Sequence, residues 1–111
     1  MTEWLLRYEG FDPKGERLRA TLSTLGNGRF ATRGAAPESR ANDVHYPGTY
    51  AAGIFNRLGV EVAGRYVENE SMVNLPDWQS LSFRVEDGDW ISVASDTVTD
   101  YVQEVDLRRG V

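Results

Sequence analysis

A chain of 111 residues has room for one small domain, and its composition (41% hydrophobic, 26% charged) is that of an ordinary soluble globular protein. It has no cysteine and one histidine, His45. Disulfide frameworks, zinc–cysteine sites, cysteine nucleophiles and multi-histidine metal clusters are therefore excluded, and we expect no metal site.

The charge is acidic and unevenly distributed. The net charge is −5, with +2 on residues 1–40 and −7 on residues 41–111. Nucleic-acid binding depends on lysine and arginine neutralising phosphates, so no nucleic-acid partner is expected. The first seven residues lack the basic start of a signal peptide, and the longest apolar stretch, residues 50–55, is too short to span a membrane. These features predict a cytoplasmic protein without a membrane partner.

Alternating apolar and polar residues predict strands in the first half of the chain. Leu18, Ala20 and Leu22 alternate with polar neighbours, which predicts a strand over residues 18–23. Asn27-Gly28 then precedes another extended run, so we expect a hairpin in which both turn residues take positive φ. Residues 34–48 contain two prolines and two glycines and predict a long exposed loop.

The second half is also read as mostly β. Residues 49–58 are apolar and predict a buried strand or short helix that ends at Gly59. Residues 81–86 and 89–93 flank Asp87-Gly88 and predict a second hairpin, with Val85 opposite Trp90. Residues 98–105 fit a helix or a strand, and their Thr, Val and Tyr content favours the strand. The prediction is an all-β, antiparallel fold of six or seven strands with little helix.

Two motifs resemble functional signatures but lack the structural context that each function needs. Residues 26–31 match a G-x-G-x-x-[GA] fingerprint, but dinucleotide binding needs a helix at the glycines, and an extended run follows instead. His45 and Asp43 lie near each other, but no G-x-S-x-G elbow accompanies them. We assign no catalytic residue.

Aromatic residues suggest a ligand more strongly. Trp4, Tyr46, Tyr50, Trp78 and Trp90 can stack on sugar rings, or they can fill a hydrophobic core. We favour the core for Trp78 and Trp90, and leave both interpretations open for Tyr46.

Five short strings occur together in an order that resembles a known family. They are Gly10-Phe11-Asp12-Pro13; Leu25-Gly26-Asn27-Gly28 with Arg33-Gly34-Ala35 and Glu38; Tyr46-Pro47-Gly48-Thr49-Tyr50 with Ala52-Gly53 and Asn56; Val73-Asn74-Leu75-Pro76-Asp77-Trp78; and Val105-Asp106-Leu107-Arg108-Arg109-Gly110-Val111. Together they resemble the start of glycoside hydrolase family 65, whose members include maltose, trehalose and kojibiose phosphorylases and acid trehalases.

The resemblance implies a β-sandwich (part of a supersandwich) in front of an (α/α)₆ barrel that carries the chemistry. The phosphorylases of the family cleave an α-glucosidic bond with inorganic phosphate and invert the anomeric centre. Their general acid and phosphate site lie in the barrel. Residues 1–111 are therefore expected to be a non-catalytic part of one N-terminal β-sandwich domain, without the barrel. The parent enzyme is expected to act on an α-linked glucose disaccharide, as a phosphorylase or as a hydrolase. No cofactor is expected, and inorganic phosphate is the co-substrate if the parent is a phosphorylase.

The candidate substrate-binding or interface residues lie in and beside the loop 34–48. They are Arg33, Glu38, Arg40, His45, Tyr46 and Tyr50. In the whole enzyme the loop is expected to reach the mouth of the barrel or a subunit interface, or else to be an ordinary surface loop.

Unpaired strand edges of an incomplete sandwich invite association, so a homo-oligomer is expected. Two other functions stay open: an independent carbohydrate-binding β-sandwich and a plain interaction module.

Overall fold

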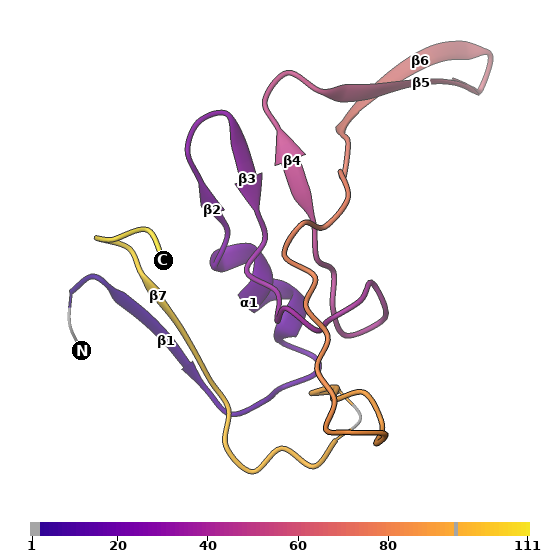
Figure 1. Cartoon of the computed structure of the whole chain (residues 1–111). Helices are drawn as coiled ribbons and strands as arrows, with labels where there is room; N and C mark the ends of the chain where they lie inside the picture. The colour runs from indigo at the N-terminus through magenta and orange to yellow at the C-terminus, as the bar shows by residue number, and fades with distance from the viewer. Residues whose placement is uncertain (1–2, 95) are drawn as a thin grey trace.

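The regular secondary structure of the described residues is antiparallel β-structure with one short helix, joined by long loops (Figure 1). The computed structural model describes residues 3–94 and 96–111. Its elements are β1 (Leu5–Glu9), α1 (Glu16–Leu22), β2 (Leu25–Gly26), β3 (Phe30–Thr32), β4 (Thr49–Ala51), β5 (Phe55–Val62), β6 (Arg65–Met72) and β7 (Val102–Asp106). The strands form three sheets, in the orders β1-β7, β2-β3-β4 and β5-β6. The all-β, antiparallel prediction is confirmed.

The first sheet joins the two ends of the described chain. β1 pairs with β7 from Leu5 opposite Asp106 to Glu9 opposite Val102, and Arg7 forms an ion pair with Glu104 across the ladder. The strand predicted for the last segment is confirmed at β7. No pattern in the sequence predicted β1, whose partner lies almost 100 residues away.

The strand predicted over residues 18–23 is wrong, because this segment is α1. Six alternating residues are too few to fix a period, and the segment is rich in Glu, Arg, Leu and Ala, which favour helices. A turn in which the Asp12 carbonyl accepts from the Gly15 and Glu16 amides (both 3.0 Å) leads into the helix. The helix buries Glu16 and Ala20, while Leu18 and Leu22 stay exposed.

The segment at Gly34 approaches the backbone of α1 closely. The Gly34 amide donates to the Ala20 carbonyl (3.0 Å), and the Gln103 side chain donates to the Gly34 carbonyl (2.6 Å). A Cβ at Gly34 would lie 2.6 Å from the Ser23 carbonyl oxygen. Gly34 thus lets the start of the loop lie between α1 and β7.

The first predicted hairpin is confirmed, with its turn displaced by one residue. β2 pairs with β3, and the Asn27 amide donates to the Phe30 carbonyl (3.2 Å). Only Gly28 takes positive φ (83°), because Asn27 uses its side chain instead: its Oδ1 accepts from the Arg29 and Phe30 amides (both 3.0 Å).

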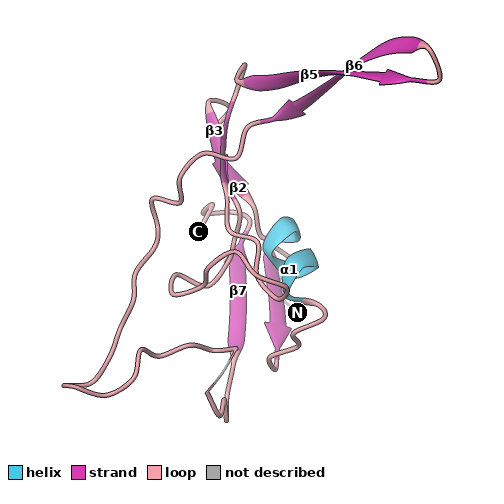
Figure 2. Ribbon diagram, turned by 90° about the vertical axis from the view of Figure 1, so that its right-hand side faces the viewer, coloured by secondary structure: helices cyan, strands magenta, loops and turns pink. Residues whose placement is uncertain are grey.

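The apolar segment 49–58 is split between two strands, and Gly59 lies inside β5 rather than ending it. β5 and β6 form a long hairpin that the sequence reading missed. Its turn residues, Ala63 (φ 50°) and Gly64 (φ 73°), both lie in the left-handed region, a conformation that Asn-Gly usually signals. Tyr66 lies across Gly59 and covers the gap in the strand. Every residue of this hairpin is exposed, and it projects from the rest of the chain (Figures 1 and 2).

The second predicted hairpin forms a turn without strands. The Gly88 amide donates to the Val85 carbonyl (3.0 Å) and the Ile91 amide to the Phe83 carbonyl (2.8 Å), but no strand is assigned over residues 81–93. Glu86, with φ 47°, is a central residue of the turn, so the turn lies one residue before the expected Asp87-Gly88 position. The guanidinium of Arg84 lies over the Trp90 ring, 4.9 Å from its centroid.

Little of the described chain is buried. Ala20 and Val105 are its only buried hydrophobic residues, and its 8712 Å² of accessible surface exceeds the roughly 6,100 Å² expected for a 12.4 kDa globular monomer. The radius of gyration, 17.4 Å, likewise exceeds about 13 Å. The core role predicted for Trp78 and Trp90 is wrong, since they are 64% and 57% exposed. A two-layer sandwich therefore stays a prediction.

Gly34→Ala tests the close approach at α1. The added methyl group would meet the Ser23 backbone, which cannot move aside as a side-chain tip can, so we expect a loss of about 1–3 kcal/mol of local stability. Hydrogen exchange over residues 16–34 should become faster. Gly26→Ala is the matched control, because its nearest contact would be the Ala31 Cβ at 3.2 Å. Equal protection in both variants would contradict the packing described.

Candidate functional site

The loop 34–48 and the segment 82–92 enclose a hollow of about 280 Å³. It is lined by Glu38, Ser39, Arg40, Asn42, His45, Ser82, Trp90, Ile91 and Ser92. Three of the six predicted site residues, Glu38, Arg40 and His45, therefore come together. The loop prediction is confirmed for residues 34–48, although His45 and Ser39 within it are buried.

Asn42 sets the conformation of the loop at His45. Its side-chain oxygen accepts from the backbone amides of Val44 (2.8 Å) and His45 (2.7 Å). The backbone amide of Asn42 donates to the His45 carbonyl (2.9 Å). Asparagine commonly closes turns in this way. The turn directs His45 into the interior, where only 4% of the residue is exposed.

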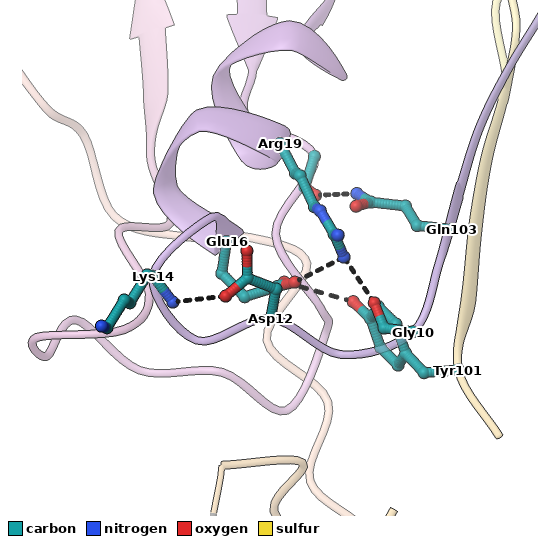
Figure 3. Close-up of polar contacts among 8 residues, drawn as sticks. Gly10, Asp12, Lys14, Glu16, Arg19, Tyr101 and Gln103 are labelled. Carbon is teal, nitrogen blue, oxygen red and sulfur yellow. Dashed lines mark hydrogen bonds and ion pairs between the residues drawn. The ribbon is translucent and has the colours of Figure 1, made fainter. Parts of the chain in front are cut away.

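Behind His45 lies a chain of contacts that reaches α1. The His45 and Phe11 ring centroids are 6.1 Å apart, and Phe11 meets Tyr101 edge-on at 5.5 Å. The Tyr101 hydroxyl donates to a Glu16 carboxylate oxygen (3.3 Å), and Arg19 donates to the other oxygen (3.3 Å) and to the Gly10 carbonyl (2.6 Å; Figure 3). These contacts tie one side of the hollow to the first helix.

The surroundings of Tyr101 keep its hydroxyl protonated. Burial, followed by the negative charges of Glu16 and Glu38 and the hydrogen bond to Glu16, raises the pKa of Tyr101 to about 12. A tyrosinate would face a buried carboxylate at hydrogen-bond distance, so the neutral form is favoured. At neutral pH Tyr101 is thus a fixed hydrogen-bond donor to Glu16.

Several polar groups of the hollow have no partner within the described residues. No side-chain hydrogen bond or ion pair joins Glu38 or Arg40 to another described residue, and the same holds for the ring nitrogens of His45. The Ser39 hydroxyl is buried without a hydrogen-bond partner. Buried polar groups of folded proteins are normally satisfied, so this cluster can accept a polar ligand.

Trp90 forms the apolar side of the hollow. It is 57% exposed, and the Arg84 guanidinium lies 4.9 Å from its ring centroid. This cation–π contact helps to fix the ring while leaving much of its surface exposed. The sequence allows either sugar stacking or a core position for Trp90, and its exposure here contradicts the core position.

Arg33 and Tyr46 lie outside the hollow and hold the ends of the loop together. Arg33 donates to the carbonyls of Tyr46 (2.6 Å) and Arg17 (2.9 Å). The guanidinium groups of Arg33 and Arg17 lie 5.4 and 5.9 Å from the centroid of the Tyr46 ring. Arg17, on α1, was not among the predicted residues.

Tyr50 lies in β4, opposite Ala31 of β3, and lines a second hollow of about 150 Å³ beside the β2–β3 turn. The six predicted residues are therefore distributed over three places. Their roles in binding stay predictions.

Neither a metal centre nor a membrane span is visible in the part of the chain that is described. No group of three or more His, Asp or Glu side chains there could hold a metal ion. No helix there is long and apolar enough to cross a membrane.

Sequence comparisons place the chain beside known proteins. The family profile described as glycosyl hydrolase family 65, N-terminal domain, matches residues 6–111. The chain is 49% identical over 107 residues to an uncharacterized glycosyl hydrolase of Mycobacterium tuberculosis, 38% identical over 117 residues to a trehalose 6-phosphate phosphorylase of Lactococcus lactis, and 29% identical over 109 residues to a kojibiose phosphorylase of Caldanaerobacter subterraneus.

These matches cover nearly all of this chain and little of the relatives. They include 96%, 98% and 98% of the chain, but only 8%, 15% and 13% of the three relatives, respectively. The chain thus spans less than a sixth of the length of these curated relatives.

The contact between Tyr101 and Glu16 predicts a stability change at high pH. A folded-state pKa raised from 10.0 to about 12 means that this tyrosine stabilises the fold fully below pH 10 and loses that contribution as the pH rises from 10 to 12. Tyr101→Phe should remove the step near pH 12 from a tyrosinate absorbance titration and flatten the stability profile in this window. Tyr66→Phe, an exposed tyrosine outside the cluster, is the control and should leave that step in place. A step that survives Tyr101→Phe would contradict the assignment.

Proposed function

The chain belongs to glycoside hydrolase family 65, and from this premise we propose that it is a non-catalytic N-terminal part of an enzyme that cleaves an α-glucosidic disaccharide with inorganic phosphate. The observation that carries the proposal is the match of residues 6–111 to the N-terminal domain of the family. The trehalose 6-phosphate and kojibiose phosphorylases among the relatives support phosphorolysis as the reaction.

In this reaction a phosphate oxygen bonds to the anomeric carbon while the glycosidic carbon–oxygen bond breaks. The leaving oxygen takes a proton, and the products are glucose 1-phosphate and the released sugar. Such chemistry requires a general acid near the scissile oxygen. We place that acid outside residues 1–111, because the resemblance assigns it to the barrel of the family.

What this chain contributes is a surface for neighbouring structure. Large hydrophobic residues are exposed along it, including Phe55, Leu58 and Trp78, and isolated surfaces of this kind are unstable in water. The hollow beside the loop 34–48 is also open to contacts from outside the chain. We place this loop near the bound substrate or at a subunit interface of the whole enzyme.

The β5–β6 hairpin is the surface that we assign to assembly with a second copy. Two strands alone are marginally stable, so an arm of this length needs a surface to pack on. One face carries Leu58, Val60, Val62 and Val67, each about half exposed. The other face carries Phe55, Tyr66 and Met72 together with four charged residues, Arg57, Glu61, Glu68 and Glu70. Arg57 pairs with Glu68 and Glu70.

Charge decides which face can meet its own copy. The charged face has three carboxylates for one guanidinium, so two such faces would repel each other. Arg65, at the tip, is the only charged residue of the apolar face. Two copies can therefore pack against each other through their apolar faces. Stable interfaces bury about 1,200–2,000 Å² in total, more than four side chains provide, so the arm is one part of a larger contact.

An independent carbohydrate-binding module is the second candidate function. The hollow with Trp90, Glu38 and Arg40 favours it, since exposed aromatic rings beside carboxylates and guanidinium groups suit sugars. The two functions differ in one readout, because a binding module alone releases no glucose 1-phosphate.

Phosphorolysis is tested on the protein expressed from its complete gene. Trehalose, trehalose 6-phosphate, kojibiose and maltose are incubated with and without inorganic phosphate, and glucose 1-phosphate is measured with a coupled assay. We expect phosphate-dependent release from at least one of the four. Release of free glucose that does not depend on phosphate would indicate a hydrolase, and no release from a folded protein would overturn the proposed reaction.

Assembly is tested by adding charge to the arm. Val60→Lys combined with Val67→Lys should shift the same protein to a smaller species in sedimentation velocity, because burying two ammonium groups at a contact is strongly unfavourable. Glu68→Gln, on the opposite face, is the control and should sediment as the wild type does. A monomeric wild type, or a double variant that keeps its assembly, would be incompatible with an interface at this face.

A further inference from the structure

We propose that the hollow between the loop 34–48 and the segment 82–92 is a binding site for one hexose unit of a neutral carbohydrate. The choice of a neutral polyhydroxyl ligand follows from the hollow itself. The choice of glucose as the hexose rests on the proposed function.

The charge of the hollow favours a neutral ligand over an anionic one. Glu38 and Arg40 both line it, and they contribute opposite charges without forming an ion pair with each other or with other described side chains. A phosphate or carboxylate ligand would be attracted by Arg40 and repelled by Glu38. A neutral ligand with hydroxyl groups can instead donate to the carboxylate and accept from the guanidinium.

The unpartnered groups match the hydrogen bonding of a polyol. The Ser39 hydroxyl is buried without a partner, and the ring of His45 has no hydrogen bond within the described chain although the residue is 4% exposed. A hydroxyl can donate or accept, whereas neutral imidazole presents one donor and one acceptor. A sugar hydroxyl group can therefore pair with the imidazole of His45, and with Ser39 where the loop lets its hydroxyl turn toward the hollow, whereas an apolar ligand can pair with neither.

Trp90 supplies the apolar surface that a pyranose ring needs. The ring is held by the Arg84 guanidinium at 4.9 Å and remains 57% exposed. The axial C–H groups of a sugar can pack on such a ring while its hydroxyl groups point to the polar side. The volume, about 280 Å³, lies just below the roughly 300–1,000 Å³ typical of small-molecule sites, which suits one ring better than an oligosaccharide.

The loop side of the hollow is pre-organised. Asn42 fixes the turn at His45 with two hydrogen bonds to its side-chain oxygen. Phe11 lies against the imidazole ring, and Tyr101 in turn packs on Phe11. A site whose groups are already in place loses less conformational entropy on binding. The contacts that hold this loop therefore increase the affinity of the hollow for a ligand.

The experiment is a calorimetric titration of the protein expressed from its complete gene. The probes are maltose, trehalose and D-glucose in phosphate-free buffer, with glucose 6-phosphate as the anionic comparison. Trp90→Ala and Glu38→Gln should each raise the Kd for the neutral sugars at least tenfold, or remove one site from the stoichiometry. Trp90→Phe, which keeps an aromatic face, should lie between Trp90→Ala and the wild type.

Trp78→Ala is the matched control, because Trp78 is also exposed but lies outside the hollow. It should bind sugars as the wild type does. Thermal unfolding of each variant separates lost binding from lost folding. Unchanged sugar binding in folded Trp90→Ala and Glu38→Gln would overturn the proposal, as would tighter binding of glucose 6-phosphate than of glucose at this site.

The two proposals fail independently. A protein that loses sugar binding in Trp90→Ala but releases no glucose 1-phosphate would retain the hexose site and contradict the phosphorylase function. A protein that releases glucose 1-phosphate and binds sugars equally well in Trp90→Ala and Glu38→Gln would support the phosphorylase function and contradict the hexose site.

Discussion

One buried carboxylate holds the described chain together. Glu16 is 4% exposed at the start of α1, and it is satisfied by Arg19 on the same helix and by Tyr101 just before β7. A buried charge left without its partners is costly, so these contacts require α1 and β7 to remain adjacent. Because Arg19 also donates to the Gly10 carbonyl, the same group fixes the segment after β1 (Figure 3).

The loop 34–48 takes its position from this cluster. It begins after β3 at Gly34, whose amide donates to the Ala20 carbonyl of α1 and whose carbonyl accepts from Gln103. Its buried residue His45 reaches Tyr101 through Phe11. A long loop that is tied at both ends can hold side chains in a fixed arrangement, as binding loops on rigid scaffolds do. The polar side of the hollow is thus built on the cluster rather than on a hydrophobic core.

Few apolar side chains of the described residues have packing partners. Only Ala20 and Val105 are buried hydrophobic residues in this part of the chain. Polar contacts and local ladders therefore carry the fold here. The arm β5–β6 and the exposed tryptophans are the surfaces where further contacts can form.

The sequence alone determined the family, the antiparallel β class, the Asn27-Gly28 hairpin and the loop at 34–48, because these depend on local turn chemistry and on strings that residues carry wherever they lie. It gave the wrong structure for residues 18–23, and it missed the β5–β6 hairpin, since Ala63-Gly64 is a weak turn signal. Only the tertiary structure decided that β1 pairs with β7, that Glu38, Arg40 and His45 share a hollow, and that Trp90 joins them. Those contacts link residues up to about 100 positions apart, and a local sequence pattern does not specify which distant segments meet. The hydrophobic core is also too small to show from the sequence which segments pack together.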